Sequence, residues 1–197
     1  MRNMMITVLL LAASGLLAGQ MEDLITESYD FEAIERYDAA IKSMTKLVEL
    51  DDDNAFYLLR LGWLYYASGQ YAAAERYYAL SAEVDPSLES LEGRMNSAYA
   101  QQKWSDALSA ADDVLKRFPN HFYALATKGY AYYTRGDYEQ SVNFYRKALT
   151  IYPYNLEAMG YLLSAEMRSG DRQAGAETLQ RLAPLSPNNP FVLEYEK

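Results

Sequence analysis

Apolar residues along this chain recur every three or four positions, in short runs that come in pairs. The first run of one such pair carries Leu58, Leu61 and Tyr65, and the second carries Ala74 and Tyr78. This spacing places side chains on one face of an α-helix. No stretch alternates apolar and polar residues as a half-buried β-strand does. The pattern therefore predicts an all-α protein built from pairs of short helices.

The pairs repeat at a nearly constant period. Prolines stand at Pro86, Pro119, Pro153 and Pro187, at spacings of 33, 34 and 34 residues, and a step of 34 back from Pro86 reaches Asp52. A small residue lies twelve positions before each of these five anchors: Ala40, Ala74, Ala107, Ser141 and Gly175. Fifteen positions before them, four of the five residues are aromatic: Tyr37, Tyr71, Trp104 and Tyr138. A period of this length is typical of repeated helical hairpins.

Each recurring residue type has a physical role in a hairpin. Small residues let the two helices approach each other closely. Gly69 and Gly136 can adopt the left-handed conformation that ends a helix and turns the chain. Proline ends the second helix, because it lacks an N–H group and restricts the residue before it.

With these residues the chain resembles the tetratricopeptide repeat family. The resemblance implies an α-solenoid of about five antiparallel helical hairpins in a right-handed superhelix, whose role is binding rather than catalysis. The repeats expected from the period are residues 21–54, 55–88, 89–121, 122–155 and 156–189, followed by a short C-terminal cap at 190–197. The third repeat has Met95 and Gln102 where the family favours glycine and is one residue short, so the register of its first helix stays open.

The first twenty residues have the composition of an export signal. Arg2 precedes a mostly apolar run from Met4 to Ala18, and Gly19-Gln20 follows. A basic end, an apolar middle and a small-residue exit are typical of a secretory signal peptide. We therefore predict an exported protein, periplasmic or extracellular, from which residues 1–20 are removed. Two alternatives are an uncleaved N-terminal membrane anchor and a buried N-terminal helix.

Charge and composition narrow the range of partners. The chain carries 18 basic and 27 acidic residues, a net charge of −9, which becomes −10 when Arg2 leaves with residues 1–20 (−9 − 1). A strongly acidic surface repels phosphate backbones, so we expect no nucleic-acid partner. With no cysteine and a single histidine, His121, we expect no metal site and no cofactor.

Catalytic and ion-binding motifs do not emerge from the sequence. The run Asp51–Asn54 lacks the glycine and the closing glutamate of a calcium-binding loop, and is expected to be a polar turn that caps the next helix. His121, in a turn between repeats, is expected at the surface. Without a nucleophile–base constellation or a glycine-rich phosphate loop, we predict no enzyme.

The candidate binding site lies on the first helix of each hairpin, which lines the inner face of such an array. Positions 30, 27, 23 and 20 before each anchor share one helix face. The partner-binding set selected from them is rich in aromatic side chains: Tyr29, Phe56, Leu59, Trp63, Tyr66, Asn96, Tyr99, Tyr123, Tyr130 and Tyr133. An exposed aromatic patch is typical of an interaction surface, although partial burial by adjacent helices is the alternative. Tyrosines at packing positions are expected in the core: Tyr37, Tyr65, Tyr71, Tyr78, Tyr132, Tyr138 and Tyr145.

The chemistry of this face indicates the kind of partner. The family's best-defined pocket binds a C-terminal carboxylate through lysine, arginine and asparagine, but here only Asn96 is present, and Glu89 and Glu92 stand where basic residues are needed. We expect instead an aromatic groove with an acidic rim, which suits a protein or peptide with apolar side chains and some positive charge. The leading hypothesis is an exported scaffold for envelope assembly or secretion. A self-assembling structural repeat protein and a carrier of a small ligand or glycan stay open as alternatives.

Overall fold

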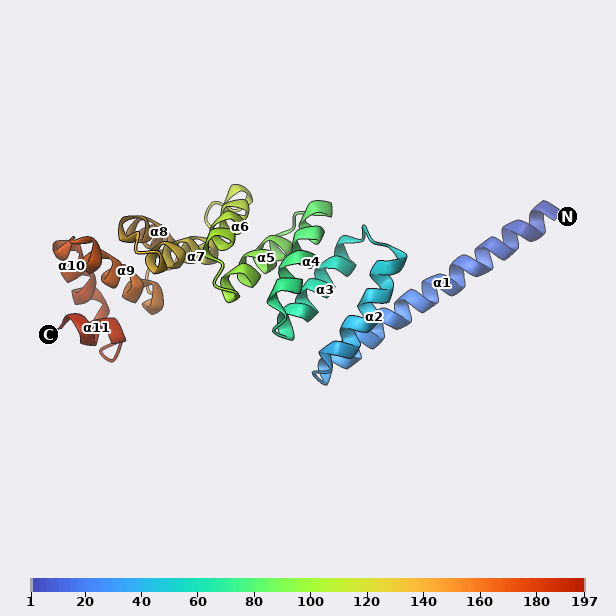
Figure 1. The fold of residues 1–197 in the computed structure, drawn as a ribbon, viewed down its shortest axis with the longest axis horizontal. Coiled ribbons are helices and arrows are strands. Elements are labelled where there is room, and N and C mark those ends of the chain that lie inside the picture. The colour runs from blue at the N-terminus through green and yellow to red at the C-terminus, as the bar shows by residue number, and fades with distance from the viewer. Residues whose placement is uncertain (1, 197) are drawn as a thin grey trace. The chain divides into compact units, whose positions relative to one another are not determined.

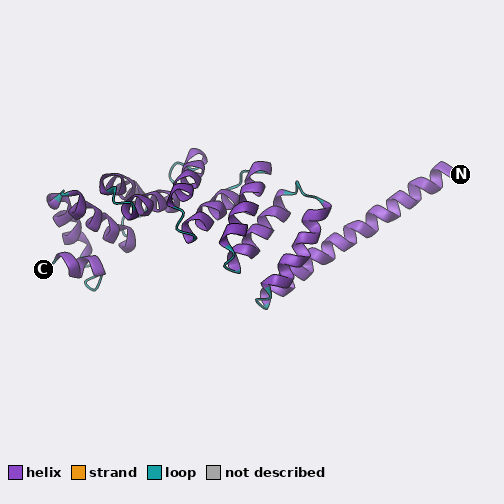
Figure 2. Cartoon of the chain, viewed as in Figure 1, coloured by secondary structure: helices purple, strands orange, loops and turns teal. Residues whose placement is uncertain are grey.

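The structure is a computed structural model that describes residues 2–196, with side chains from residue 17 onward. Within these residues the chain is all helical and has no strand (Figures 1 and 2). The helices are α1 (Arg2–Ala33), α2 (Tyr37–Leu50), α3 (Ala55–Ala67), α4 (Tyr71–Val84), α5 (Leu88–Ala100), α6 (Trp104–Arg117), α7 (Phe122–Thr134), α8 (Tyr138–Ile151), α9 (Leu156–Ser169), α10 (Arg172–Leu182) and α11 (Pro190–Tyr195). The prediction of an all-α array of consecutive helical hairpins is confirmed.

The described helices group into two compact units, Met1–Arg94 and Met95–Lys197, and the division falls inside α5. In unit 1, α2 and α3 supply most of the core, and α1 packs on it through Leu24, Ile25 and Phe31. The N-terminal part of α1 extends past the end of α2 (Figure 1). The fully buried core residues of α2 and α3 are Ala40, Met44, Leu47, Leu61 and Leu64.

Tyr78 of α4 packs against two glycines of unit 1. The Tyr78 side chain is 5% exposed. A Cβ atom added at Gly62 of α3 would lie 2.9 Å from the Tyr78 Cδ1 atom, and one added at Gly93 of α5 would lie 2.4 Å from its Cε1 atom. Both helices therefore approach the ring more closely than any larger residue would allow.

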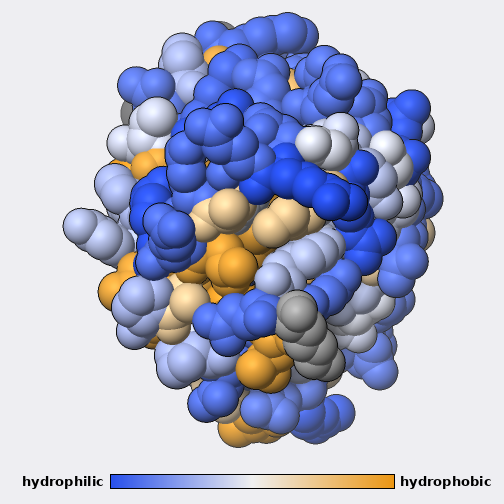
Figure 3. All heavy atoms as spheres, turned by 90° about the vertical axis from the view of Figure 1, so that its left-hand side faces the viewer, coloured by the Kyte–Doolittle hydropathy of each residue, from blue (hydrophilic) through white to orange (hydrophobic). Residues whose placement is uncertain are grey.

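In unit 2 the core is formed by α7, α8 and α9 and closed by α10 and α11. Val192 of α11 is fully buried, and Phe191 packs over Gly160 of α9, where an added Cβ would lie 2.8 Å from the Phe191 Cδ2 atom. Viewed from the end that carries the C-terminal helices, apolar residues gather near the middle of the surface, with hydrophilic residues around them (Figure 3). Leu185 and Leu193 remain about half exposed, at 49% and 50%.

A residue with positive φ occupies the turn inside every hairpin. Gly69, Gly136 and Gly170 have φ values of 77°, 78° and 93°, which confirms the role predicted for the first two. The corresponding turns of the first and third hairpins place Glu35 and Gln102 at φ 58°, a conformation that side chains with a Cβ disfavour. The third repeat therefore keeps the turn geometry although it lacks the glycine.

The residue that the third repeat lacks falls in a turn. Helices α3, α5 and α7 all have 13 residues. Three residues, 85–87, join α4 to α5, whereas four residues, 118–121, join α6 to α7. The Ser87 Oγ atom accepts a hydrogen bond from the Ser90 N–H group at 3.2 Å, which caps the start of α5. The register of this helix, open in the sequence, is thereby set.

Side chains in the turns between hairpins cap the next helix. The Asn54 Oδ1 atom accepts a hydrogen bond from the Tyr57 N–H group at 3.3 Å, as expected for the polar turn after α2. The Nδ1 atom of His121 accepts from the Ala124 N–H group at 3.2 Å, so this histidine is the N-cap of α7. His121 is half-buried rather than a free surface residue, because capping holds its ring against the helix end.

The prediction that seven tyrosines lie in the core is correct for two of them. Tyr78 and Tyr145 are buried, whereas the other five are half-buried: Tyr37, Tyr65, Tyr71, Tyr132 and Tyr138. The Tyr65 ring stacks on Tyr77 with centroids 5.3 Å apart, and Tyr132 stacks on Phe144 at 5.5 Å. Tyr65 and Tyr132 therefore each pack on a neighbouring ring and remain half-buried.

A buried carboxylate links the last three long helices. Glu166 of α9 is 2% exposed and accepts hydrogen bonds from the Arg146 Nη2 atom at 2.7 Å and the Thr178 Oγ1 atom at 2.7 Å. Arg146 lies on α8 and Thr178 on α10. The charge is thus paired and hydrogen-bonded, as a buried carboxylate must be if its burial is not to be costly.

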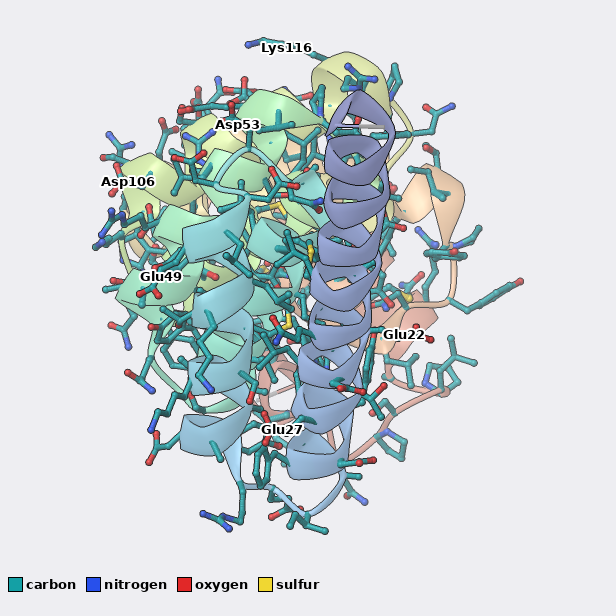
Figure 4. The ribbon with its side chains drawn as sticks, turned by 90° about the vertical axis from the view of Figure 1, so that its right-hand side faces the viewer. Glu22, Glu27, Glu49, Asp53, Asp106 and Lys116 are labelled. Carbon is teal, nitrogen blue, oxygen red and sulfur yellow. The ribbon has the colours of Figure 1, made fainter. Side chains whose placement is uncertain are left out.

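The predicted export signal, residues 1–20, lies mostly outside the residues with described side chains. Its backbone from Arg2 onward belongs to α1, which continues to Ala33. Acidic side chains mark the described surface of unit 1: Glu22 and Glu27 of α1, Glu49 of α2 and Asp53 of the following turn are all exposed (Figure 4). In the described part of the chain, we find no helix that combines the length and the hydropathy of a membrane span.

Candidate partner-binding surface

None of the ten residues predicted to bind a partner is buried. Five aromatic side chains are exposed: Tyr29 (47%), Phe56 (45%), Trp63 (46%), Tyr99 (37%) and Tyr123 (63%). Asn96 is exposed as well, and the remaining four are half-buried: Leu59, Tyr66, Tyr130 and Tyr133. Half of the set belongs to unit 1 and half to unit 2. A single groove that runs through all ten therefore stays a prediction.

In unit 1 a charged pair holds the aromatic side chains in place. The Arg60 guanidinium carbon lies 3.6 Å from the centroid of the Tyr29 ring, within the range of a cation–π contact. Glu32 forms an ion pair with the Arg60 Nη2 atom at 2.5 Å and accepts a hydrogen bond from the Trp63 Nε1 atom at 2.6 Å. The Trp63 ring stacks on Tyr66 with centroids 6.5 Å apart. The exposed Tyr29 and Trp63 rings are thus pre-positioned for contact.

Unit 2 contains a pocket of about 240 Å³ with mainly aromatic walls. The Tyr130 ring of α7, one of the lining residues, contacts two others: its centroid lies 5.4 Å from that of Tyr99 of α5 and 5.1 Å from that of Tyr161 of α9. The Trp104 ring packs behind Tyr99 and Tyr130, at 5.7 Å and 5.6 Å. The pocket is lined by Asn96, Tyr99, Phe122, Tyr123, Ala126, Thr127, Tyr130, Tyr145, Asn155, Glu157, Ala158 and Tyr161.

The pocket has a negative charge and neutral phenols. Among the described residues that line it, Glu157 is the only charged one, and it is exposed. Burial, followed by the neighbouring Tyr130 and Glu157, raises the pKa of Tyr99 to about 12. Burial and then Tyr130 also raise the pKa of Tyr161 to about 12. Both hydroxyls therefore stay protonated at physiological pH, and the pocket offers aromatic faces beside one carboxylate.

Tyr133 lies beside the pocket, where polar contacts fix it. Its hydroxyl hydrogen-bonds with the Ser164 Oγ atom at 2.8 Å, and Ser164 also hydrogen-bonds with the Tyr195 hydroxyl at 3.3 Å. The Arg168 guanidinium lies over the Tyr133 ring, 5.7 Å from its centroid. Hydrogen bonds with Tyr138 and Tyr195 raise the pKa of Arg168 further above its ordinary value. Tyr133 is therefore a supporting residue and does not line the pocket.

The sequence model of the tetratricopeptide repeat matches residues 25–88 and 94–155. The chain belongs to the tetratricopeptide repeat family. This family relation agrees with the helical hairpins, their 34-residue period and their small contact residues. A tetratricopeptide repeat array is a scaffold consistent with protein–protein interaction.

Solved structures of tetratricopeptide repeat proteins share the fold. One structure of MamA superposes with a TM-score of 0.80 at 18% identity and covers 91% of this chain and 97% of its own. MamA residues 41 to the end from Desulfovibrio magneticus RS-1 reach a TM-score of 0.76 at 15% identity, with 87% and 97% covered. A tetratricopeptide repeat protein from Parabacteroides merdae reaches 0.77 at 20% identity, with 89% and 70% covered. At these identities the likeness concerns the fold alone.

One curated relative is similar over part of its sequence. It is the N-terminal acetyltransferase A complex auxiliary subunit NAA15 of Arabidopsis thaliana, 27% identical over 146 residues, which cover 56% of this chain. The aligned region spans only 16% of that relative's length.

A simple spacing connects the inner faces of consecutive repeats. Residues 31 apart on successive first helices touch: Tyr29 and Arg60, Glu32 and Trp63, Tyr99 and Tyr130, Tyr130 and Tyr161, Tyr133 and Ser164. The spacing is three residues less than the repeat, close to one helical turn. In the pairs α1 and α3, α5 and α7, and α7 and α9, a residue therefore contacts the following first helix about one turn before its equivalent position there.

Tyr161 is the main pocket residue that the sequence analysis missed. The fixed offsets from Pro187 selected Gly160 and Ser164 of α9 for the inner face and passed over Tyr161. Adding 31 to Tyr99 and again to Tyr130 leads to Tyr161, so the signal was available in the sequence. Two core-type residues, Phe122 and Tyr145, also reach the pocket wall, which periodicity alone does not show.

Proposed function

We propose that this chain is an exported scaffold that binds a segment of a partner protein in the aromatic pocket of unit 2. The observation that carries the proposal is the row formed by Tyr99, Tyr130 and Tyr161, three rings from three successive first helices around one pocket. Tyrosine and tryptophan contribute most strongly at protein interfaces, because they combine apolar area with a polar group.

The size of the pocket favours a protein segment over a free small molecule. Sites for drug-sized ligands measure about 300–1,000 Å³ and enclose most of the ligand. The present pocket, at about 240 Å³, suits one or two side chains. At its rim, Tyr123 of the lining is 63% exposed, and Tyr152 outside the pocket is 55% exposed; both rings contact Phe122 of the pocket wall. The neighbouring residues of a bound segment would contact these rings.

The binding proposal can be tested by site-specific photocrosslinking in the native compartment. A photoreactive phenylalanine in place of Tyr123 is expected to capture one foreign protein, at a mapped segment. The Tyr99→Ala variant should lose the crosslink, because a pocket wall is removed. The matched control is Tyr154→Ala, since Tyr154 is 78% exposed and does not line the pocket.

A synthetic peptide of the mapped segment should compete with the crosslink and bind the purified chain. Capture that survives Tyr99→Ala, or a peptide that does not compete, would refute the pocket as the binding site. Crosslinks between copies of this chain alone would instead support the self-assembling alternative.

Export is a separate part of the proposal and rests on residues 1–20. The basic Arg2, the apolar run and the small residues at Ala18 and Gly19 match a cleavable signal. When the full chain is expressed in a bacterium with two membranes, we expect a periplasmic product whose N-terminus lies near Gln20. An uncleaved product in the membrane fraction would favour the anchor alternative, and an uncleaved product in the cytoplasm would refute export.

A further inference from the structure

Cations already lie on several aromatic rings of this protein. The Arg60 guanidinium lies on Tyr29, the Lys128 Nζ atom lies 4.5 Å from the Phe144 centroid, and Arg168 lies over Tyr133. In each case a basic side chain of the chain itself covers the ring. Attraction of a cation to the electron-rich face of an aromatic ring is general, and a nearby carboxylate strengthens it.

The unit 2 pocket is lined by other aromatic rings, and no basic side chain is among its described lining residues. Tyr99, Tyr130 and Tyr161 line it, and none of its described lining residues is a lysine, an arginine or a histidine. Glu157 lines the same pocket. Its charge contributes to the raised pKa values of both Tyr99 and Tyr161, which places it electrostatically close to both hydroxyls. The pocket is therefore complementary to a positive charge.

The rest of the wall is apolar. Phe122, Ala126 and Ala158 line the pocket together with the rings. A lysine side chain matches this combination, because its four-carbon stem packs on apolar surface while its ammonium group keeps polar and aromatic partners. The exposed rings of Tyr123, which lines the pocket, and of Tyr152 beside it provide contact area for the residues next to that lysine, which a free amine would leave unused.

We propose that the pocket selects a lysine of the partner segment, whose ammonium group contacts the rings of Tyr99, Tyr130 and Tyr161 from the pocket side, near Glu157. The assignment rests on the proposed function, since it names the side chain that the same pocket takes. It also explains why an acidic scaffold would choose partners with some positive charge.

The test compares two uncharged-backbone probes that differ in one group. N-acetyl-lysine methylamide carries the ammonium group, and N-acetyl-norleucine methylamide has a similar apolar stem without it. Each is titrated into the full-length ¹⁵N-labelled chain, and the amide shifts of Tyr99, Tyr130 and Tyr161 are followed by NMR. We expect the lysine probe to bind about three- to thirty-fold more tightly, the range of cation–π attraction at partly desolvated sites.

Two variants separate the charge from the shape of the pocket. Glu157→Gln should weaken the lysine probe about three- to tenfold and leave the norleucine probe unchanged, because only the ammonium group interacts with the lost charge. Glu139→Gln removes an exposed charge on α8 that does not line the pocket, and should change neither affinity. The amide spectrum of each variant reports whether it is folded.

Several results would overturn the assignment. Equal or tighter binding of the norleucine probe would show that the pocket takes an apolar side chain, and the proposed function would stand without its lysine. Tighter binding of choline than of the lysine probe would show that the pocket binds a free quaternary amine instead. No pocket shift with any probe would also reject the lysine. The proposed function itself fails separately, when Tyr123 captures no foreign protein.

Discussion

The contact of Tyr78 with Gly93 allows a sharp test of how closely successive hairpins pack. In the Gly93→Ala variant the new Cβ atom would lie 2.4–2.5 Å from three ring atoms of Tyr78. Carbon atoms without a bond pack best at about 3.5–4.0 Å, so the ring or the helix must move by about 1 Å. Tyr78 is 5% exposed, and Gly62 of α3 also contacts its ring, which limits that movement.

The expected free-energy change follows from two opposing effects. Overpacking of a tight core costs about 1–3 kcal/mol. In the opposite direction, alanine favours the helix over glycine by about 1 kcal/mol. For Gly93→Ala the overlap is severe, and we expect a net destabilisation of about 1–2 kcal/mol. For Gly62→Ala the nearest ring atom lies at 2.9 Å, the overlap is smaller, and the two effects should nearly cancel.

The assay is urea unfolding of the full chain, followed by circular dichroism at 222 nm. Repeat arrays can unfold in steps, so the tyrosine fluorescence transition is recorded on the same samples. A double-mutant cycle with Tyr78→Leu isolates the contact: in a chain that already carries Tyr78→Leu, Gly93→Ala should lose its destabilising effect. A Gly93→Ala variant as stable as the parent, or a penalty that persists after the ring is removed, would refute this account of the packing.

Three further predictions concern the turns, the buried carboxylate and the pocket phenols. Gln102→Gly should raise the free energy of unfolding by about 0.5–1 kcal/mol, because glycine accepts the positive φ without steric cost. The urea midpoint should rise accordingly, and a lower midpoint would show that the turn is unstrained. Arg146→Met should lower the free energy of unfolding by about 2–3 kcal/mol, because the buried Glu166 carboxylate then lacks its charged partner. A Glu166→Leu change in the same chain should recover part of that loss, and no recovery would contradict this interpretation. The raised pKa values of Tyr99 and Tyr161 mean that the folded state favours their neutral forms. Their contribution to the stability of the folded state is therefore complete below pH 10 and is lost between pH 10 and about 12. Over that range the urea midpoint should fall as the phenolate absorbance at 295 nm rises, and a constant midpoint would speak against it.

The sequence predicted the hairpins because their packing demands are local and periodic. Small residues must recur where two helices touch, and glycines such as Gly69 and Gly136 mark turns that need a left-handed residue. Gln102 escaped this reasoning, because it adopts the positive φ of these turns without being a glycine. The residue missing from the third repeat was visible, but only the structure places the gap in the turn before α5.

The candidate site was predictable only in part. Exposure of the aromatic residues agreed with their helix face, since that depends on the spacing within one helix. Tyr161 was missed because a pocket between helices depends on how far each helix is shifted along its neighbour. Fixed offsets from the prolines give no information on that shift. The contact of Tyr133 with Ser164 shows it directly, because these residues are 31 positions apart in a repeat of 34.

The 31-residue spacing has a consequence for how such a surface can change during evolution. Tyr99, Tyr130 and Tyr161 form a ladder with one ring from each repeat. Duplication of a 34-residue unit would copy each ring to a position 34 residues on, three residues past the position that a contact at the 31-residue spacing requires. Extension of the ladder therefore needs a new aromatic residue three positions before the copied one, so duplication of a repeat alone does not lengthen this surface.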